Sequence, residues 1–257
     1  RAKHQKKSFA AAWDNQFGSW EYQAVMKQDK GTEIIVDWED GTSVKMSASQ
    51  LYELVFESNN QWMLSANGTI FSYEFEAIIP GLLKRWYAER KEMQRKMHEC
   101  GDNEIEKEFW DKRQLVKKIN LNSLYGAILN PGCRFFDIRI GQSVTLTGRC
   151  ITKHMGAKVN EVITGNYDHR GDSIIYGDTD SVYFSAYKPL QNEITSGKIP
   201  WQKENIINLY DKISDEVNGT FTGFMTKAFH CPKTRGEVIK AGRELVASKG
   251  LFITKKR

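Results

Sequence analysis

Apolar and polar positions along the chain follow the period of strands in some segments and the period of helices in others. Residues 32–46 predict two short strands, because the Asp40-Gly41 pair between them is a strong hairpin-turn signal. Residues 62–75 predict a second hairpin, which turns at an Asn-Gly pair. Two antiparallel hairpins are therefore expected in the first third of the chain.

Helical periodicity predicts one short helix and four long ones. The short helix covers residues 47–58, and Ser47 or Ser49 can cap its start. Gly101-Asp102-Asn103 separates the first two long helices, which therefore form an antiparallel helical hairpin. The long helices are expected at residues 79–100, 104–128, 140–163 and 204–227.

Further strands are expected near residues 237–247 and 251–254. The chain shows no internal repeat and no low-complexity tract. Because strands and helices mix without a βαβ rhythm, the sequence predicts the α+β class.

The composition is that of an ordinary globular protein, with 40% hydrophobic and 27% charged residues. We expect no membrane association, because no apolar run approaches the length of a spanning helix. The four cysteines form no C-x-x-C pair, which argues against a zinc site. Reduced thiols are therefore expected, and they predict a cytoplasmic setting, which is the host cytoplasm if the protein is viral. The net charge of +5 permits a polyanionic partner without demonstrating one.

The segment SIIYGDTDSVYF, residues 173–184, predicts two apolar strands around a tight turn. Asp178 and Asp180 are two residues apart, so their carboxylates project to one side and suit the divalent cations of two-metal phosphoryl transfer. An ordinary polar turn is the commoner explanation of a lone D-x-D, by roughly three to one. A D-x-D glycosyltransferase also stays open, whereas an EF-hand is excluded because Tyr183 stands where glycine is required.

A second candidate lies in the segment KKINLNSLYGAILN. Lys118, Asn122 and Tyr125 share one helical face, which suits contact with a triphosphate, a sugar or base, and a stacked base pair. Gly126 allows another backbone or a base pair to approach closely. A surface helix with a solvated lysine and a core tyrosine explains the pattern about as well. However, Asn122-Ser123 costs roughly half a kcal/mol per residue relative to alanine in mid-helix, which points mildly to function.

The pattern K-x-x-x-N-S-x-Y-G followed by Y-G-D-T-D-S resembles motifs B and C of the family B DNA polymerases. The flanking segments FFDIRIGQSVTLTGR and WYAERKEMQRKM look most like the replicative polymerases of T-even-type bacteriophages. The resemblance is strong over residues 62–184, weaker at RELVASKG and TKKR, and poor before residue 60. It implies addition of deoxynucleotides to a primer 3′-hydroxyl, with primer–template DNA and deoxynucleoside triphosphates (dNTPs) as partners.

The resemblance also implies roles for the residues of the helix. Lys118 would bind the phosphates of the incoming nucleotide, with Asn122 beside it and Ser123 in support. Tyr125 would pack under the nascent base pair, where Gly126 relieves the contact.

At the hairpin turn, the resemblance implies that Asp180 is a direct ligand of two Mg²⁺ ions and that Asp178 supports it. Thr179 would hold the turn. Glu244 aligns with an acidic residue near the metal site, although Gly242 replaces the aspartate that usually accompanies it.

Several basic residues match positions of the family that contact phosphates or DNA. Arg90 matches an arginine that grips the triphosphate tail. Gln94 stands where the family has a lysine, so either Arg95 substitutes for that lysine or the phosphate contact is weaker. Lys255 and Lys256 resemble a segment in which a lysine contacts the minor groove of the primer–template.

The fold implied by the resemblance is an antiparallel palm sheet with helices, plus a two-helix antiparallel fingers hairpin. Residues 78–130 would form the fingers, residues 131–257 the palm with motif C, and residues 1–77 a palm-associated region or an insertion. Motif A and the thumb have no counterpart in the chain, so we expect separate polymerase fragments to supply them. The alternative is a catalytically inactive remnant or subunit that binds nucleic acid. Mg²⁺-dependent binding of nucleotides would distinguish an active polymerase fragment from such a remnant.

Overall fold

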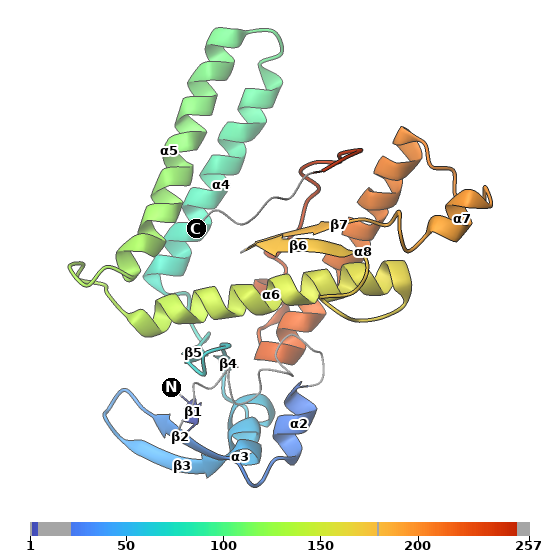
Figure 1. Ribbon diagram of the computed structural model, residues 1–257. Coiled ribbons are helices and arrows are strands. Elements are labelled where there is room, and N and C mark those ends of the chain that lie inside the picture. The colour runs from blue at the N-terminus through green and yellow to red at the C-terminus, as the bar shows by residue number, and fades with distance from the viewer. Residues whose placement is uncertain (1, 5–21, 179, 251–257) are drawn as a thin grey trace.

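The computed structural model describes residues 2–4, 22–178 and 180–250. Long helices and small antiparallel sheets make up this part of the chain, which confirms the α+β class. Helix α6 (Ile138–Thr164) crosses the middle of the molecule, and the other elements lie on different sides of it (Figure 1). No helix among the described residues combines the length and apolar character that spanning a membrane requires.

An antiparallel three-stranded sheet lies at one end of the molecule (Figure 1). The predicted first hairpin is confirmed, and Gly41 at its turn has a φ of 84°, which favours glycine. Ile34 and Val36 point from the middle strand into the core and are fully buried. The strands, in their order in the sheet, are β1 (Ala2–His4), β2 (Glu33–Asp37) and β3 (Ser43–Ser47).

Two short helices, α2 (Tyr22–Gln28) and α3 (Ala48–Tyr52), pack beside this sheet. Ser47 caps α3 as predicted: its hydroxyl accepts a hydrogen bond from the Gln50 backbone N–H, and the Gln50 side chain accepts one from the Ser47 backbone. The predicted single helix instead continues as a π-helical turn, η1 (Glu53–Glu57). Leu51 and Val55 of this segment are fully buried in the same core.

The second predicted hairpin is also confirmed and consists of β4 (Trp62–Leu64) and β5 (Ile70–Ser72). Its turn docks on α6 through a buried polar cluster centred on Asn67. The Asn67 amide donates to the Arg139 carbonyl at 3.0 Å, and its oxygen accepts from the Ser143 hydroxyl at 2.9 Å. Because Asn67 is fully buried, these bonds replace the hydration that the amide loses on folding.

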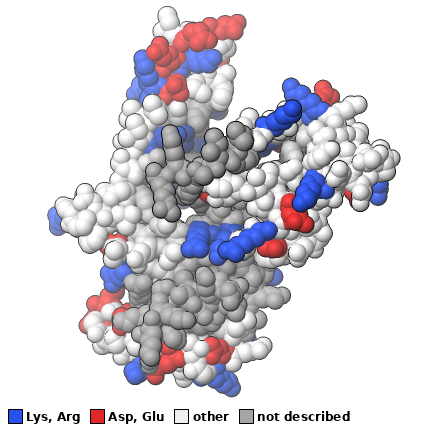
Figure 2. Space-filling model, viewed as in Figure 1, with Lys and Arg blue, Asp and Glu red and all other residues white. Residues whose placement is uncertain are grey.

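Helices α4 (Ile78–Glu99) and α5 (Glu104–Ile128) form the predicted antiparallel hairpin, which extends away from the body (Figure 1). No α4 side chain is buried, so contacts at its surface hold the pair together. Lys117 forms an ion pair with Glu89, and the Lys96 ammonium lies 4.6 Å from the Trp110 ring centroid. Acidic and basic side chains mix at the far end, as expected for a solvated tip (Figure 2).

Helix α8 (Lys203–Phe229) crosses α6, contributes its last turns to the first core and forms a second apolar core with α6 (Figure 1). Val159 of α6 packs there with Val217 and Phe221 of α8. Helix α7 (Gln191–Thr195) precedes α8, and the single turn α9 (Lys233–Gly236) follows it. The predicted long helices at residues 140–163 and 204–227 are therefore both present, each slightly longer than expected.

The strand expected near residues 237–247 is absent, and residues 237–250 have no regular secondary structure. Side-chain contacts with α8 hold the segment instead. Asn218 bonds both the N–H and the carbonyl of Ala241, each at 2.8 Å, and the Arg243 Nε lies 2.6 Å from an Asp211 carboxylate oxygen. A strand needs a ladder partner, and no described strand is paired with this segment. The strand expected at residues 251–254 lies outside the described residues.

Candidate active site

The two aspartates flank the turn of a two-stranded hairpin, as the sequence predicts. Strand β6 (Ile174–Asp178) pairs antiparallel with β7 (Ser181–Phe184), and Asp178 lies opposite Ser181 at the turn end. Asp178 is half-buried and Asp180 is exposed. Thr179, which was expected to hold this turn, lies outside the described residues.

Helix α6 positions the hairpin through the side chain of Asn160, which is 1% exposed. Its oxygen accepts hydrogen bonds from the hydroxyl of Ser173 at 2.7 Å and from the Ser173 backbone N–H at 3.2 Å. Its amide donates to the Asn166 carbonyl at 2.8 Å. Strand β6 begins one residue after Ser173. The bonds from Asn160 therefore fix the start of the carboxylate-bearing strand against α6.

The donor chemistry of the turn fits a hard divalent cation. Mg²⁺ commonly binds one or two carboxylates and takes its remaining ligands from water and substrate phosphates. Asp180 offers an exposed carboxylate that has no ion pair or hydrogen bond to another described side chain. No group of three or more His, Cys, Asp or Glu suited to a metal occurs within the described residues. The part of the chain described here thus supplies two carboxylates at most.

The other candidate residues lie near the end of α5 that docks on α6. Lys118 and Asn122 are both exposed, and neither side chain is bonded to another described residue. Their positions, four residues apart on a regular helix, leave the ammonium and the amide on one solvent-facing side. Ser123 is likewise exposed. This face can therefore meet a ligand without first breaking a contact with any residue that the structure describes.

Tyr125, in contrast, is half-buried and anchors α5 to α6. Its hydroxyl lies 2.6 Å from the Thr145 hydroxyl and 3.3 Å from the Gly141 carbonyl. The Thr145 hydroxyl also lies within hydrogen-bond distance of the Gly141 carbonyl, at 2.9 Å, so the three groups form one cluster. The tyrosine expected next to a base pair is thus bonded through its hydroxyl to α6.

The two glycines at this junction have different surroundings. A Cβ added at Gly126 would meet no described atom within 4 Å, so packing among the described residues does not require glycine there. A Cβ at Gly141 would lie 1.9 Å from Leu129 Cδ2, well inside van der Waals contact. Gly141 is therefore needed for the close approach of α5 to α6, whereas the space at Gly126 is available to a ligand.

The arginines of α4 differ in how far they are already engaged. Arg90 donates to the Gln114 side chain of α5 at 3.1 Å, which keeps its guanidinium on the α5-facing side. Arg95 is held by Glu92 and Glu99 of its own helix, and these hydrogen bonds raise the pKa of its guanidinium. Substitution for the lysine missing at Gln94 would require Arg95 to leave both carboxylates.

The remaining predicted residues lie near or beyond the end of the described part of the chain. Glu244 is exposed in the irregular segment after α9, and it follows Arg243, which is paired with Asp211 of α8. The acidic residue expected on a strand near the metal site is therefore not on a strand. Lys255 and Lys256 lie outside the described residues.

Sequence reasoning missed the residues that position the site from α6. Asn160, Gly141 and Thr145 touch no expected ligand, but they fix the hairpin and the end of α5. The one available signal for Asn160 was the poor helix propensity of asparagine in the middle of a helix. The same signal singled out Asn122. Their partners are distant in sequence and became visible only in the fold.

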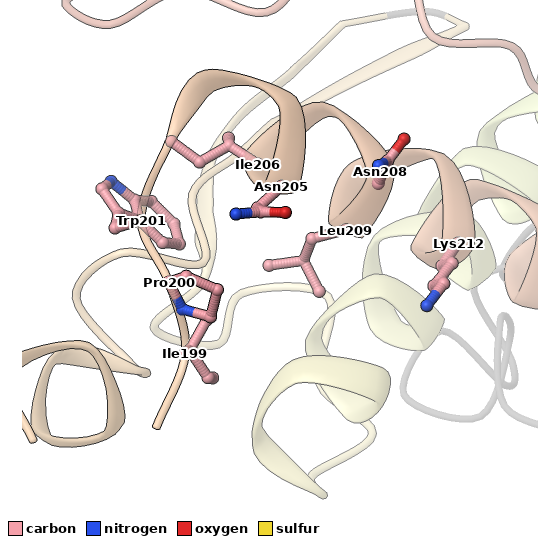
Figure 3. A pocket seen from close by; sticks show the side chains of 8 residues that line it. All are labelled: Ile199, Pro200, Trp201, Asn205, Ile206, Asn208, Leu209 and Lys212. Atoms are coloured by element: carbon pink, nitrogen blue, oxygen red, sulfur yellow. The ribbon is translucent and has the colours of Figure 1, made fainter. Parts of the chain in front are cut away.

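A pocket near the start of α8 is separate from all these residues (Figure 3). Ile199, Pro200 and Trp201 form one wall, and Leu209 and Lys212 of α8 form another. The residues that line it include no carboxylate and none of the predicted site residues. The pocket therefore shares no residue with the candidate site at α5 and the β6–β7 turn.

Comparison with known proteins places this arrangement in a family. The model of DNA polymerase family B matches residues 36–228, so the chain belongs to the family B DNA polymerases. A DNA polymerase of Pyrococcus glycovorans is 29% identical over 187 residues, which cover 68% of this chain and 22% of that protein. The DNA polymerase delta catalytic subunit of Oryza sativa subsp. japonica is 36% identical over 148 residues, or 57% of this chain and 12% of the plant protein.

A phage relative is similar over a shorter stretch. The DNA-directed DNA polymerase of Escherichia phage RB69 is 38% identical over 76 residues, which cover 29% of this chain and 8% of the phage protein. Because archaeal, plant and phage polymerases all match, the expected kinship with T-even-type phages stays a prediction. The chain spans about a fifth of the length of its archaeal relatives. The family match also removes the glycosyltransferase interpretation.

Proposed function

We propose that this chain supplies the nucleotide-binding helix and the metal-binding carboxylates of a DNA-directed DNA polymerase. One observation supports the proposal: α6 anchors α5 at Tyr125, just beyond the exposed Lys118–Asn122 face, and also anchors at Ser173 the hairpin whose turn carries Asp178 and Asp180. In this assignment the α4–α5 hairpin (residues 78–130) is the fingers. Residues 131–257 belong to the palm, and residues 1–77 are associated with it.

The residues of this chain would act mainly by positioning and charge neutralisation, which dominate the catalysis of phosphoryl transfer. Lys118 would bind the triphosphate of a dNTP, and Arg90 would reach it from α4. Tyr125, held by Thr145, would limit the position of the new base pair above Gly126. Asp180, with Asp178 in support, would hold two Mg²⁺ ions, which activate the attacking primer oxygen and stabilise the leaving one.

Primer extension is proposed for this chain only together with the rest of a polymerase. Its relatives are several times longer, and the matched region is 22% of the Pyrococcus glycovorans protein. The other polymerase segments, in the same or a separate polypeptide, would supply a further metal-binding carboxylate and a thumb that grips primer–template DNA. Nucleotide binding, in contrast, can be measured on this chain alone.

The test is Mg²⁺-dependent binding of a fluorescent dNTP to the chain. We expect Lys118→Gln to weaken binding about 10–100-fold, the equivalent of one charge-assisted hydrogen bond. The matched control is Lys117→Gln, which removes the same charge one residue away, where the ammonium is paired with Glu89. Asp180→Asn should abolish the part of the binding that depends on Mg²⁺.

Two outcomes would contradict the proposal. Equal effects of Lys118→Gln and Lys117→Gln would show that the exposed helix face does not bind the triphosphate. DNA binding together with no Mg²⁺-dependent dNTP binding would favour the catalytically inactive, nucleic-acid-binding alternative.

A further inference from the structure

The pocket between residues 199–201 and the first turns of α8 is called the α8 pocket below. Its volume is about 310 Å³, which falls at the lower end of the range of ligand-binding pockets. Trp201 lies at one end and Lys212 at the other, with Asn205 and Leu209 between them (Figure 3). The pocket therefore presents an aromatic ring, an amide, an aliphatic side chain and an ammonium group in one row.

Both walls of the α8 pocket are formed by contacts within the chain. Asn205, Leu209 and Lys212 follow the spacing i, i+4, i+7, so they share one face of α8. On the opposite wall, the Ile199 backbone N–H donates to a carbonyl of α7 at 3.1 Å. The Trp201 ring packs against Tyr187, with ring centroids 5.5 Å apart. A ligand would therefore meet a pocket that is already formed.

The polar groups of the α8 pocket are available to a ligand. Among the residues that the structure describes, none is hydrogen-bonded to the Trp201 indole N–H, the Asn205 amide or the Lys212 ammonium. Ile199 and Leu209, both half-buried, supply apolar surface between these groups. A side-chain amide can donate to a backbone carbonyl and accept from a backbone N–H. This mixture of groups suits a peptide segment with an apolar side chain.

Charge around the α8 pocket favours an acidic segment. Lys198 and Lys203 lie on either side of the wall formed by residues 199–201, and Lys212 lies at the far end of the pocket. All three lysines are exposed, and none forms an ion pair within the described part of the chain. A partner with several carboxylates would therefore be attracted to this surface.

The acidic residues nearby do not neutralise these lysines. Asp211 is paired with Arg243, whose Nε lies 2.6 Å from its carboxylate. Glu193 and Glu204 form no ion pair with any described residue. None of the three carboxylates lines the pocket, so each of them leaves the ammonium of Lys212 open to an incoming acidic group.

We propose that the α8 pocket is a docking site for an extended acidic segment of a partner protein. An apolar side chain of the partner would lie between Trp201 and Leu209, and a carboxylate would face Lys212. The helix face from residue 205 to residue 212 is roughly 10 Å long, which matches about three extended residues. Tryptophan in an apolar pocket is a typical anchor of protein interfaces.

A peptide fits the α8 pocket better than a nucleic acid does. A nucleic-acid strand needs a cation for each phosphate that it neutralises, whereas a single ammonium lines this pocket and the rest of its lining is apolar or amide. The proposal goes beyond the proposed function and does not depend on it, because the pocket contains none of the residues assigned to nucleotide or metal binding.

The test measures fluorescence anisotropy of a labelled peptide of about eight residues, in which a leucine and a phenylalanine lie between aspartates, with the full chain. One reference peptide has asparagine in place of each aspartate, and the other has serine in place of the two apolar residues. We expect the acidic apolar peptide to bind, and each reference peptide to bind at least about fivefold more weakly, since each lacks one of the two attractions.

Variants of the chain locate the binding. Trp201→Ala should weaken binding of the acidic apolar peptide at least about tenfold, and Lys212→Gln about two- to fivefold, as expected for an exposed charge pair. The matched control is Lys233→Gln, which removes an exposed ammonium on α9 that is also free of ion pairs with described residues, and it should bind like the unmodified chain.

Circular dichroism and thermal melting establish that each variant is folded. If Trp201→Ala does not fold, Asn205→Ala takes its place, because Asn205 is exposed and the substitution removes only its amide. It should weaken binding by about threefold or more, the equivalent of one hydrogen bond.

Three results would overturn the inference. The first is no binding of the acidic apolar peptide, and the second is the same affinity in the pocket variants as in Lys233→Gln. The third is a single-stranded oligonucleotide that binds more tightly than the peptide and is weakened by the same variants, which would assign the pocket to nucleic acid. Binding of dNTP, measured on the same preparations, should be unchanged in these variants, and its failure would bear on the proposed function alone.

Discussion

Gly141 and Gly148 both lie within α6, but their surroundings predict opposite effects of adding a methyl group. Gly141→Ala would bring Cβ to 1.9 Å from Leu129 Cδ2 and 2.7 Å from its Cγ. We expect a loss of about 1–3 kcal/mol in the free energy of unfolding, which is typical of overpacking. Gly148→Ala meets nothing within 4 Å and should instead stabilise the chain by about 0.5–1 kcal/mol. The free energies of unfolding of both variants can be measured by urea denaturation.

The cause of the Gly141 effect can be isolated with a second substitution. Leu129→Ala removes the atoms with which the new Cβ would clash, so it should remove most of the penalty of Gly141→Ala in a double-mutant cycle. A penalty of the same size in both backgrounds would mean that the backbone of α6, and not its contact with α5, requires the glycine.

At the scale of elements, His154 joins α6 to α8 and makes their packing sensitive to pH. The His154 Nε2 lies 3.0 Å from the Thr220 hydroxyl of α8, which is also 2.7 Å from the Val217 carbonyl. The ring stacks on Phe224 with centroids 4.1 Å apart. Burial lowers the pKa of His154 to about 3, with a smaller contribution from Lys158.

This depressed pKa predicts a loss of stability in mild acid. Above pH 6.5 the imidazole is neutral in both the folded and the unfolded chain. Below pH 6.5 only the unfolded chain takes up the proton, so stability falls by about 1.4 kcal/mol per pH unit until the pH nears the folded pKa. Urea unfolding between pH 6.5 and 5, above the range of most carboxylates, measures this slope.

Replacement of the histidine gives the control. His154→Gln should be less stable at pH 7, because the contact with Phe224 changes, but its stability should depend less on pH. His169→Gln removes a less buried imidazole whose pKa is also lowered, and it should change the slope less. An unchanged slope in His154→Gln would contradict the prediction.

Sequence patterns predict well those elements whose formation depends on residues that are close together in the sequence. The turn at Asp40-Gly41 forms because Gly41 adopts a positive φ, and α4 and α5 separate at a punctuating Gly-Asp-Asn. The predicted strand over residues 237–247 failed because a strand also needs a partner, and Asn218 and Asp211 of α8 hold this segment by side chains instead.

The same distinction applies to the candidate site. The spacing of Asp178 and Asp180, and the shared face of Lys118 and Asn122, follow from hairpin and helix geometry and are therefore readable in the sequence. The anchoring of Tyr125 by Thr145 depends on how two helices meet, and no local pattern encodes it. The functional roles of these residues stay predictions until nucleotide binding is measured.

At the scale of the whole molecule, α6 is bonded to both the β4–β5 hairpin and the carboxylate hairpin. Asn67 fastens the β4–β5 hairpin to its first turns, and Asn160 fastens the carboxylate hairpin near its other end. The two anchor points, Ser143 and Asn160, are 17 residues apart, or roughly 26 Å along a helix. If α6 couples the two parts, the loss of either anchor should destabilise a single cooperative unit.

We therefore expect Asn67→Ala and Asn160→Ala each to lower the free energy of unfolding by about 2–3 kcal/mol, because each leaves buried polar groups without a partner. Their effects should add within about 0.5 kcal/mol, since the sites share no contacts. Asn205→Ala, at an exposed position on α8, is the control and should change stability by less than about 0.5 kcal/mol.

Urea unfolding followed by both tryptophan fluorescence and far-UV circular dichroism should give coincident curves for all variants. Curves that separate in Asn160→Ala but not in Asn67→Ala would mean that the carboxylate hairpin unfolds independently. In that case α6 would serve as a support for separate parts and would not couple them.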